Sequence, residues 1–266
     1  MTREIKNSVF FTILIFVTSI IFLFGFKSYT EVKDGMVLIE GNSNIKSFWI
    51  DVTPVTVAQF REFVQQTHFK TQAERFGNAG VFDFKTGTWG LEDGATWEYP
   101  FGKKAGLANA NHPVTQVSWN DANAYCKWAK KRLPTSEEYV FAEKNGNQNF
   151  GQTYTWGDDF FENKKYKTNF WQGNFPFKNT VADGFLTTSP VGYFGKNKLG
   201  LSDIEGNVWQ WCSDDSEMRE GEKNQRGGSF LCDPMVCHGF KTGGISSSSA
   251  ETSLCHSGFR CARSIN

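Results

Sequence analysis

The chain has 266 residues, and its 28 basic and 28 acidic residues give a formal net charge of zero. Proteins that bind nucleic acid need a basic excess or a basic patch, so this balance argues against a nucleic-acid partner. Aromatic residues make up 16% of the chain, and 26 glycines accompany only seven prolines. This composition predicts tight turns that are packed by large rings.

The N-terminal region contains a long apolar segment. Residues 9–26 carry no charge, and as a helix they would span roughly 27 Å, close to the hydrocarbon thickness of a bilayer. A cleaved signal peptide is the alternative, but its apolar core is usually shorter, and no A-x-A cleavage pattern follows here. Arg3 and Lys6 precede the segment, which by the positive-inside rule places the N-terminus in the cytoplasm. We therefore expect a cytoplasmic tip at 1–8, a transmembrane anchor at 9–26, a linker at 27–35, and a domain at 36–266 on the extracytoplasmic side, in the periplasm or at the cell exterior.

Two amphipathic segments in the first half of the domain predict helices. One runs over about 57–67, with Thr56 as its N-cap, and the other runs over about 121–131, with Asn120 as its N-cap. Their apolar residues recur at helical spacing, namely Val57, Phe60 and Val64 in the first, and Ala122, Tyr125, Cys126 and Ala129 in the second.

A third helix is indicated by residues 135–138, where Thr135 and Glu138 form a capping box, and Gly146 is expected to end it. Beyond Gly146 no helical period persists. Short apolar runs alternate with Gly, Asn and Asp, which predicts short strands and long ordered loops in an α+β domain. Ordering such loops costs conformational entropy. Metal ions or disulfides are expected to offset this cost.

The chain has six cysteines, and two of them lie close together in sequence. Cys232 and Cys237 flank a turn that contains Pro234, so their sulfurs can approach each other. Two adjacent thiolates suit a soft metal ion, above all Cu(I). A structural disulfide across a short loop is the alternative, and spacing alone favours it. The other four are Cys126, Cys212, Cys255 and Cys261.

Several motifs occur in a characteristic order along the domain. They are VSWNDA at 117–122, KRLPT at 131–135, YTWG at 154–157, NFWQG at 169–173, DGF at 183–185, GNVWQW at 206–211, RGGS at 226–229 and GFRC at 258–261. Together they resemble the formylglycine-generating enzymes, also called sulfatase-modifying factors, over about residues 36–263. The resemblance implies a C-type-lectin-like domain of the formylglycine-generating-enzyme type, low in regular secondary structure.

The resemblance also implies an activity. Such enzymes are copper-dependent and oxygen-dependent oxidases that convert a cysteine of an exported, sulfatase-like protein to Cα-formylglycine. Cys232 and Cys237 fall on the family's two redox-active cysteines, which hold Cu(I) while dioxygen oxidises the substrate cysteine to an aldehyde. Ser229 and Trp209 match positions that line the oxygen and substrate pocket, although a turn hydroxyl and a core aromatic are the simpler interpretations. We expect a monomer.

Two calcium sites and one disulfide are implied in the same way. The disulfide would join Cys126 and Cys261, whereas Cys212 and Cys255 have no family role and either pair with each other or stay free. Calcium takes about six to eight oxygens and accepts backbone carbonyls. A turn residue that caps its own backbone is the alternative for each Asn or Asp. Gln210 stands where the second site commonly has an acid, which weakens that site. The first site would use Asn169, Phe170, Asp183 and Phe185, and the second Asp203, Ile204, Gly206 and Val208.

Between Cys237 and Gly258 the sequence departs from the family pattern. The usual arginine-rich run is absent, and Lys241 alone keeps a positive charge in 238–245. A serine-rich stretch at 246–253 follows, for which a solvated loop is one interpretation. These segments help to build the family's groove for the substrate peptide, where Ser253 and His256 remain candidates. The departure leaves the identity of the substrate open.

Fold alone does not determine function, and the same fold is compatible with two other functions. One is a catalytically silent scaffold or ligand-binding protein of the same fold, in which Cys232 and Cys237 form a permanent disulfide. The other is an iron-dependent sulfoxide synthase. That enzyme needs a cluster of histidines, and the chain's four histidines show no close His-x-x-x-His spacing. We therefore set it aside.

Overall fold

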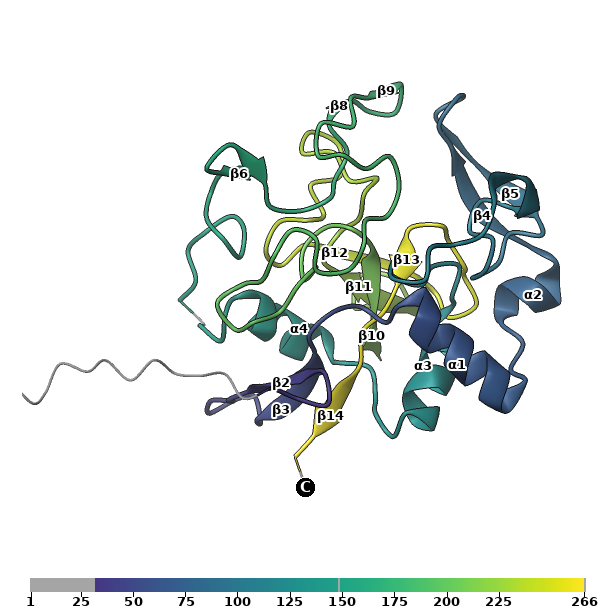
Figure 1. Ribbon diagram of the computed structural model, residues 1–266. Helices are drawn as coiled ribbons and strands as arrows, with labels where there is room; N and C mark the ends of the chain where they lie inside the picture. Colours follow the sequence, from purple (N-terminus) through teal and green to yellow (C-terminus); the bar gives the residue numbers. More distant parts are fainter. Residues whose placement is uncertain (1–31, 148, 266) are drawn as a thin grey trace, which may run out of the picture.

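The computed structural model describes residues 32–147 and 149–265. The fold contains two four-stranded sheets. In Figure 1 the sheet with β10 to β13 lies near the centre, the sheet with β2, β3 and β14 lies below it, and long loops lie above. The first sheet has the order β1-β2-β3-β14, and the second has the order β12-β11-β10-β13. Their strands are β1 (Val32–Lys33), β2 (Met36–Ile39), β3 (Phe48–Asp51), β10 (Trp209–Asp215), β11 (Glu222–Arg226), β12 (Ile245–Ser249), β13 (Ser257–Gly258) and β14 (Ala262–Ser264).

The first sheet joins the two ends of the domain, because β14 pairs antiparallel with β3 and places Ala262 opposite Ile50. Its inner face packs on Tyr139 and Phe141 of the helix α4 (Ser136–Glu143) in one buried cluster. β1 pairs with β2, so the folded domain already includes Val32 and Lys33. The linker expected at 27–35 is therefore too long at its C-terminal end.

The second sheet carries the segments that surround the paired cysteines. β10 and β11 are antiparallel, as are β11 and β12, whereas β10 and β13 are parallel. Residues 246–249 of the serine-rich stretch lie in the edge strand β12, whereas 250–253 continue as a turn, so the interpretation as a solvated loop is wrong for the first half of the stretch. Small polar side chains are tolerated at an edge because one side of such a strand faces solvent.

Two predicted helices are confirmed. α1 spans Val57–Thr67, and Thr56 caps it in a capping box with Gln59; its buried face includes Phe63, whereas Val64, which was predicted there, is only partly buried. α4 begins after the predicted cap Thr135, whose hydroxyl accepts from the Glu138 N–H. The helix ends at Glu143, and the chain turns back through Gly146 in the left-handed region.

The predicted start of the second long helix is wrong by two residues. α3 spans Trp119–Trp128, and its N-cap is Ser118 rather than Asn120. The Ser118 hydroxyl accepts from the Asp121 N–H at 3.2 Å, and the Asp121 carboxylate accepts from the Ser118 N–H at 2.9 Å. This reciprocal pair satisfies two donors at once, which a cap at Asn120 would not do.

The shorter elements were not predicted individually, although short strands were expected beyond Gly146. They are α2 (Gln72–Phe76), the 3₁₀ helix η1 (Lys103–Ala105), and three two-stranded hairpins: β4 (Asn78–Asp83) with β5 (Thr88–Asp93), β6 (Phe161–Glu162) with β7 (Lys165–Tyr166), and β8 (Gly173–Asn174) with β9 (Lys178–Asn179). In Figure 1 the hairpin of β4 and β5 projects from the body of the domain. Within the described part of the chain, no helix follows α4, as expected.

The membrane anchor predicted at 9–26 lies outside the described residues. Among residues 32–147 and 149–265, no helix is long and apolar enough to cross a bilayer.

Candidate functional site

The structure brings the sulfurs of Cys232 and Cys237 to 3.0 Å from each other. A short turn accounts for this approach. The backbone N–H of Cys237 donates to the Asp233 carbonyl at 3.0 Å, and the Asp233 carboxylate accepts from the Met235 N–H at 2.8 Å. Asp233 therefore folds the four-residue connection 233–236 back on itself and sets the two side chains side by side.

The two cysteines have different surroundings. Cys232 is 1% exposed, whereas Cys237 is exposed to solvent. Burial raises the pKa of the Cys232 thiol well above its ordinary value. The hydrogen bond from Cys232 lowers the pKa of Cys237 to about 7. Cys232 thus stays protonated and donates a hydrogen bond, whereas Cys237 readily forms a thiolate. The thiolate is the form in which a cysteine is nucleophilic and binds metal.

Trp209 and Ser229 lie beside the buried sulfur. The Ser229 hydroxyl is 3.9 Å from Cys232 Sγ and accepts from the Leu231 N–H at 3.2 Å. Trp209 belongs to the same buried cluster as Cys232. Gly239 brings them together: a β-carbon added there would lie 2.4 Å from the Trp209 ring and 3.1 Å from Cys232 Sγ. All four predicted residues of the redox site are therefore neighbours.

Two residues of this neighbourhood were not predicted as site residues. The Tyr154 hydroxyl is 2.7 Å from His238 Nε2, and His238 directly follows Cys237 in the sequence. Burial lowers the pKa of His238 and raises that of Tyr154. The sequence contained only a weak indication of this pair, because Tyr154 is 84 positions away from His238.

The first expected calcium set contains an unsatisfied oxygen. Among the described residues, Asn169 Oδ1 is buried and has no hydrogen-bond partner. The Phe170 carbonyl and Asp183 Oδ2 both accept from the side-chain amide of Gln172, so these two oxygens converge on one point. Asp183 Oδ1 accepts from the Phe185 N–H at 2.9 Å, and burial raises the pKa of Asp183. An oxygen-rich, partly unsatisfied cradle of this kind fits a calcium ion, provided that the Gln172 amide rotates away.

The second expected set is already satisfied by donors of the protein. Asp203 Oδ2 accepts from the Gly192 N–H at 2.6 Å, and Asp203 Oδ1 accepts from the Asn207 amide at 3.3 Å. The Ile204 carbonyl accepts from the Tyr139 hydroxyl at 2.7 Å. A cation would have to displace these donors.

A cation of the protein itself also lies at this second set. Arg260 is fully buried, and its guanidinium donates to the Asp203 carbonyl at 2.7 Å and to Gln210 Oε1 at 2.6 Å. The Gly206 carbonyl accepts from the Val208 N–H at 2.8 Å. With a guanidinium nearby and Gln210 in place of an acid, the second set fits calcium poorly.

The remaining cysteines are all buried. The sulfurs of Cys126 and Cys261 are 3.0 Å apart, and a movement of about 1 Å would bring them to the separation of about 2.05 Å in a disulfide. Cys212 and Cys255 lie in separate buried clusters. A bridge between Cys212 and Cys255 therefore has no support from the fold.

The two remaining candidates in the altered segment are largely covered by other residues. Ser253 is buried and His256 is partly exposed. Desolvation lowers the pKa of His256 to about 3, and its ring centroid lies 4.9 Å from that of Trp89. In the described part of the chain, His256 Nδ1 and Ser253 Oγ have no hydrogen-bond partner. Neither residue is positioned as an exposed substrate ligand in this arrangement.

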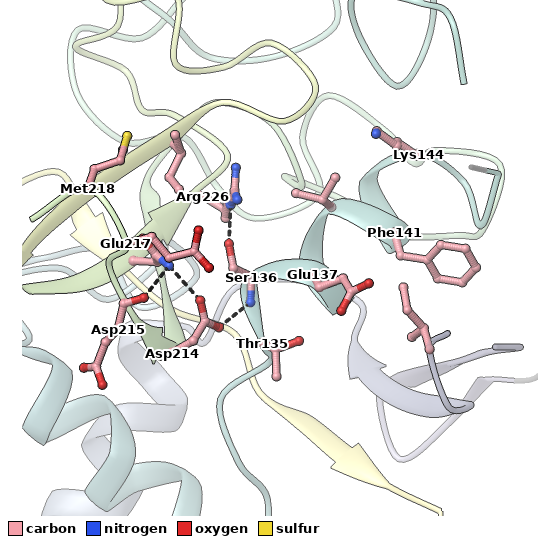
Figure 2. A pocket seen from close by; sticks show the side chains of 14 residues that line it. Thr135, Ser136, Glu137, Phe141, Lys144, Asp214, Asp215, Glu217, Met218 and Arg226 are labelled. Atoms are coloured by element: carbon pink, nitrogen blue, oxygen red, sulfur yellow. Dashed lines mark hydrogen bonds between the residues drawn. The ribbon is translucent and has the colours of Figure 1, made fainter. Parts of the chain in front are cut away.

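A cavity of about 810 Å³ lies away from the cysteine pair, between α4, β10 and β11. Figure 2 shows Ser136 bonded to both Arg226 and Asp214, and each of these contacts is 2.6 Å long. Arg226 also donates to the Gly243 carbonyl at 2.7 Å, which ties this wall to the segment after Cys237. None of the predicted site residues lines the cavity.

Comparison with known proteins identifies relatives along the whole domain. The family described as "Sulfatase-modifying factor enzyme 1-like domain" matches residues 22–265. The formylglycine-generating enzyme of Streptomyces coelicolor is 38% identical over 248 residues, which cover 82% of this chain and 78% of that protein. The protein named inactive C-alpha-formylglycine-generating enzyme 2 of Bos taurus is 37% identical over 238 residues, which cover 82% of this chain and 77% of that protein.

Among solved structures, PvdO from Pseudomonas aeruginosa is similar, with a TM-score of 0.61 and 22% sequence identity. The match covers 83% of this chain and 81% of that chain. At this level of identity the likeness shows a shared fold and nothing about activity.

Proposed function

The chain belongs to the family of sulfatase-modifying factor enzymes and is an oxidoreductase, and we propose that it converts a cysteine side chain of a protein substrate to formylglycine. The observation that carries this proposal is the 3.0 Å approach of Cys232 and Cys237. Only one of the two is exposed. A substrate thiol can therefore reach the pair from one side, while the other sulfur stays sheltered from solvent.

The donor set fits Cu(I), because two adjacent thiolates are soft ligands and no hard oxygen ligand is positioned between them. Cu(I) held by Cys232 and Cys237 would supply the electron transfer that activates dioxygen. Cys237 would have to rotate slightly to open the pair, and its exposed position on the turn permits this. Trp209 and Ser229 shield Cys232 on its buried side and limit the access of water.

The proposed reaction needs a second reductant. Conversion of the substrate thiol to an aldehyde withdraws two electrons, whereas dioxygen takes up four as it is reduced to the level of water. A small thiol can supply the other two electrons. The balanced reaction is then R–CH₂SH + O₂ + 2 R′SH → R–CHO + H₂S + H₂O + R′S–SR′.

The substrate is proposed to be a cysteine-bearing protein of the sulfatase type. The name of the S. coelicolor relative refers to formylglycine formation, and the family recognises the sequence Cys-x-Pro-x-Arg. Because the segment 238–256 departs from the family pattern, the residues around the reacting cysteine need not follow that sequence. Peptides from other exported thiol proteins therefore belong in the test.

Calcium is proposed as a structural ion at the first expected set alone. The support is the unsatisfied Asn169 Oδ1 together with the convergence of the Phe170 carbonyl and Asp183. An ion at this point would tie the segments around 170 and 183 to each other. Because Phe170 shares a buried cluster with Cys232, it would indirectly stabilise the cysteine pair.

The test uses the purified full-length chain in reduced form. Cu(I) is titrated against a competing chelator, and peptides with Cys-x-Pro-x-Arg are then incubated with the protein, dioxygen and a thiol. Mass spectrometry reports the aldehyde as a loss of sulfur and a gain of oxygen. Cys232→Ser and Cys237→Ser should abolish tight Cu(I) binding and product formation, because serine keeps the size of the side chain but removes the soft ligand.

Cys212→Ser and Cys255→Ser are the matched controls, because both sulfurs lie in other buried clusters. They should retain Cu(I) binding and activity. If the reduced native protein fails to bind Cu(I) tightly, the enzymatic proposal is wrong. Failure on Cys-x-Pro-x-Arg with normal Cu(I) binding would instead indicate a different peptide sequence.

A second function is a silent scaffold with a permanent Cys232–Cys237 disulfide. The bovine relative whose name calls it inactive shows that members with this level of identity need not share one activity. The 3.0 Å separation also suits a disulfide after a small movement. Thiol titration of the protein as isolated separates the two functions, because the scaffold would resist mild reduction at this pair.

A further inference from the structure

Aromatic rings form a parallel stack next to the cysteine pair. The rings of Trp156 and Tyr154 are 5.0 Å apart and inclined by 6°, and those of Tyr154 and Phe240 are 5.6 Å apart and inclined by 8°. Phe240 continues onto Phe170 at 4.5 Å and 20°. Most aromatic pairs in this protein meet edge-on or tilted, so a run of parallel rings is a distinct arrangement.

The stack leads from the surface into the buried cluster that contains Cys232. Trp156 is partly exposed, Tyr154 is 2% exposed, and Phe240 is fully buried. Phe240 shares its buried cluster with Cys232 and Trp209. The stacked rings thus connect the surface with the buried cluster around Cys232, a sulfur that solvent itself does not reach.

Tyr154 has a proton acceptor in place. Its hydroxyl is 2.7 Å from His238 Nε2, a distance at which a proton can move along the hydrogen bond. Oxidation of a tyrosine at moderate potential requires that its proton leave together with the electron. A buried tyrosine without such a partner would be hard to oxidise, because the protonated radical cation would form in an apolar site.

We propose that Trp156 and Tyr154 form an electron entry route to Cys232 and Cys237, with Tyr154 as the relay residue. The inference rests on the proposed function, which requires two electrons from a thiol for each aldehyde formed. The oxidant is the dioxygen that the proposed function reduces at Cys232 and Cys237. In each one-electron step, Tyr154 gives one of the two extra electrons for this reduction and passes its hydroxyl proton to His238 Nε2, which leaves a neutral tyrosyl radical. Phe240 is not itself oxidised. The electron passes through its packed side chain on the way from Tyr154 to the cysteine pair.

A thiol at the surface closes each step. It loses one electron through Trp156 to the tyrosyl radical and one proton to solvent, while His238 returns its proton to Tyr154. After two steps the two thiyl radicals join as one disulfide. The two protons released by the thiols equal the two taken up when water forms, so electrons and protons balance.

The first experiment needs neither copper nor a protein substrate. Of the six cysteines, all within the described residues, Cys237 alone is exposed. A ruthenium polypyridyl photo-oxidant is attached there in the full-length chain, and transient absorption after a flash with a quencher follows the radicals. We expect a tyrosyl radical in the native protein and its loss in Tyr154→Phe, which keeps the ring stack but removes the transferable proton.

Tyr166→Phe is the matched control. Tyr166 packs on Phe170 at 5.7 Å but edge-on, at 64°, outside the parallel stack. It should leave the radical yield unchanged. Trp156→Phe should lengthen the lifetime of the Tyr154 radical in the presence of thiol at least about tenfold. An absent tyrosyl signal in the native protein, or an undiminished one in Tyr154→Phe, overturns the proposal.

The second experiment measures turnover with a thiol reductant. Tyr154→Phe should lower kcat about tenfold, with unchanged KM for the peptide and unchanged Cu(I) binding. If Tyr154→Phe forms aldehyde at the native rate, the route is wrong although the proposed function stands. If the native protein forms no aldehyde while the flash experiment gives the expected radicals, the proposed function fails and the electron route is supported on its own.

Discussion

The backbone of Gly239 packs directly against the indole ring of Trp209. A β-carbon at position 239 would lie 2.4 Å from one ring carbon of Trp209 and 2.5 Å from another. The same β-carbon would lie 3.1 Å from Cys232 Sγ. Gly239 is not among the glycines with positive φ, so space rather than backbone conformation requires glycine here.

Gly239→Ala should therefore damage the site more than the fold. The Trp209 ring or Cys232 has to move, and overpacking of this kind costs about 1–3 kcal/mol of stability. We expect Cu(I) binding to weaken and kcat to fall at least about tenfold. Chelator competition measures Cu(I) binding, peptide oxidation measures kcat, and urea unfolding measures the loss of stability.

Gly90→Ala is the control for this variant. A β-carbon at Gly90 would meet no atom within 4 Å, and this position in β5 also lacks a positive φ. Its stability should change by no more than about 0.5 kcal/mol, with activity unaltered. Full Cu(I) binding in Gly239→Ala would show that the pair does not depend on this contact.

The approach of Cys126 and Cys261 predicts a disulfide once the protein is oxidised. The two residues are 135 positions apart, and closing a loop of this length can contribute about 5 kcal/mol through the unfolded state. Cys126→Ala, Cys261→Ala and the double variant should then lose similar amounts of stability, because one bridge is lost in each. Additive losses, or free thiols at both positions in non-reducing peptide mapping, would contradict the bridge.

The long helices could be predicted because their caps are local. Thr56 and Thr135 each accept a hydrogen bond from the residue three positions further on, and the sequence predicted the N-terminal ends of both α1 and α4 correctly. Ser118 was overlooked, because Asn120 is also a good cap residue and only the reciprocal bond with Asp121 decides between them. The short helix α2 does carry a local signal, a capping box of Thr71 with Glu74 and a left-handed Gly77 at its end, which was overlooked in the sequence. The hairpin of β4 and β5 packs on the segment around Leu254, and a local pattern does not contain that contact.

The same difference between local and long-range features applies to the functional site. The proximity of Cys232 and Cys237 followed from their separation of five positions across a turn, whereas the pairing of Tyr154 with His238 joins segments 84 positions apart. The second calcium set illustrates the opposite difficulty. Its residues match a pattern, but the buried guanidinium of Arg260 occupies the surroundings of Asp203, and only the folded chain reveals that charge.

Calcium should bind the native protein once per chain, at the set that includes Asp183. An ion bound to the folded state stabilises it by about 2.7 kcal/mol when its free concentration is about 100 times the dissociation constant. Chelation should therefore lower the Tm of the native protein but not that of Asp183→Asn. Isothermal titration that finds two calcium ions per chain, or a native Tm insensitive to chelation, would contradict this assignment.

Acid should destabilise the protein partly through His256. Burial lowers the pKa of His256 to about 3 in the folded state, whereas an unfolded histidine has a pKa of about 6.5. Between these values the unfolded state binds a proton that the folded state does not. The free energy of unfolding then falls as the pH falls through this window, by up to about 1.4 kcal/mol per pH unit from this group.

His256→Phe should remove this contribution, because phenylalanine can pack beside Trp89 without titrating. Urea unfolding between pH 7 and pH 4 should give a shallower loss of stability in His256→Phe than in the native protein, and the difference between the two curves isolates His256 from the carboxylates. His68→Asn serves as the control, since His68 is exposed at the C-terminal end of α1 and tolerates the left-handed conformation that asparagine also adopts. Parallel curves for the native protein and His256→Phe would mean that His256 gains its proton without unfolding, through an opening at Trp89.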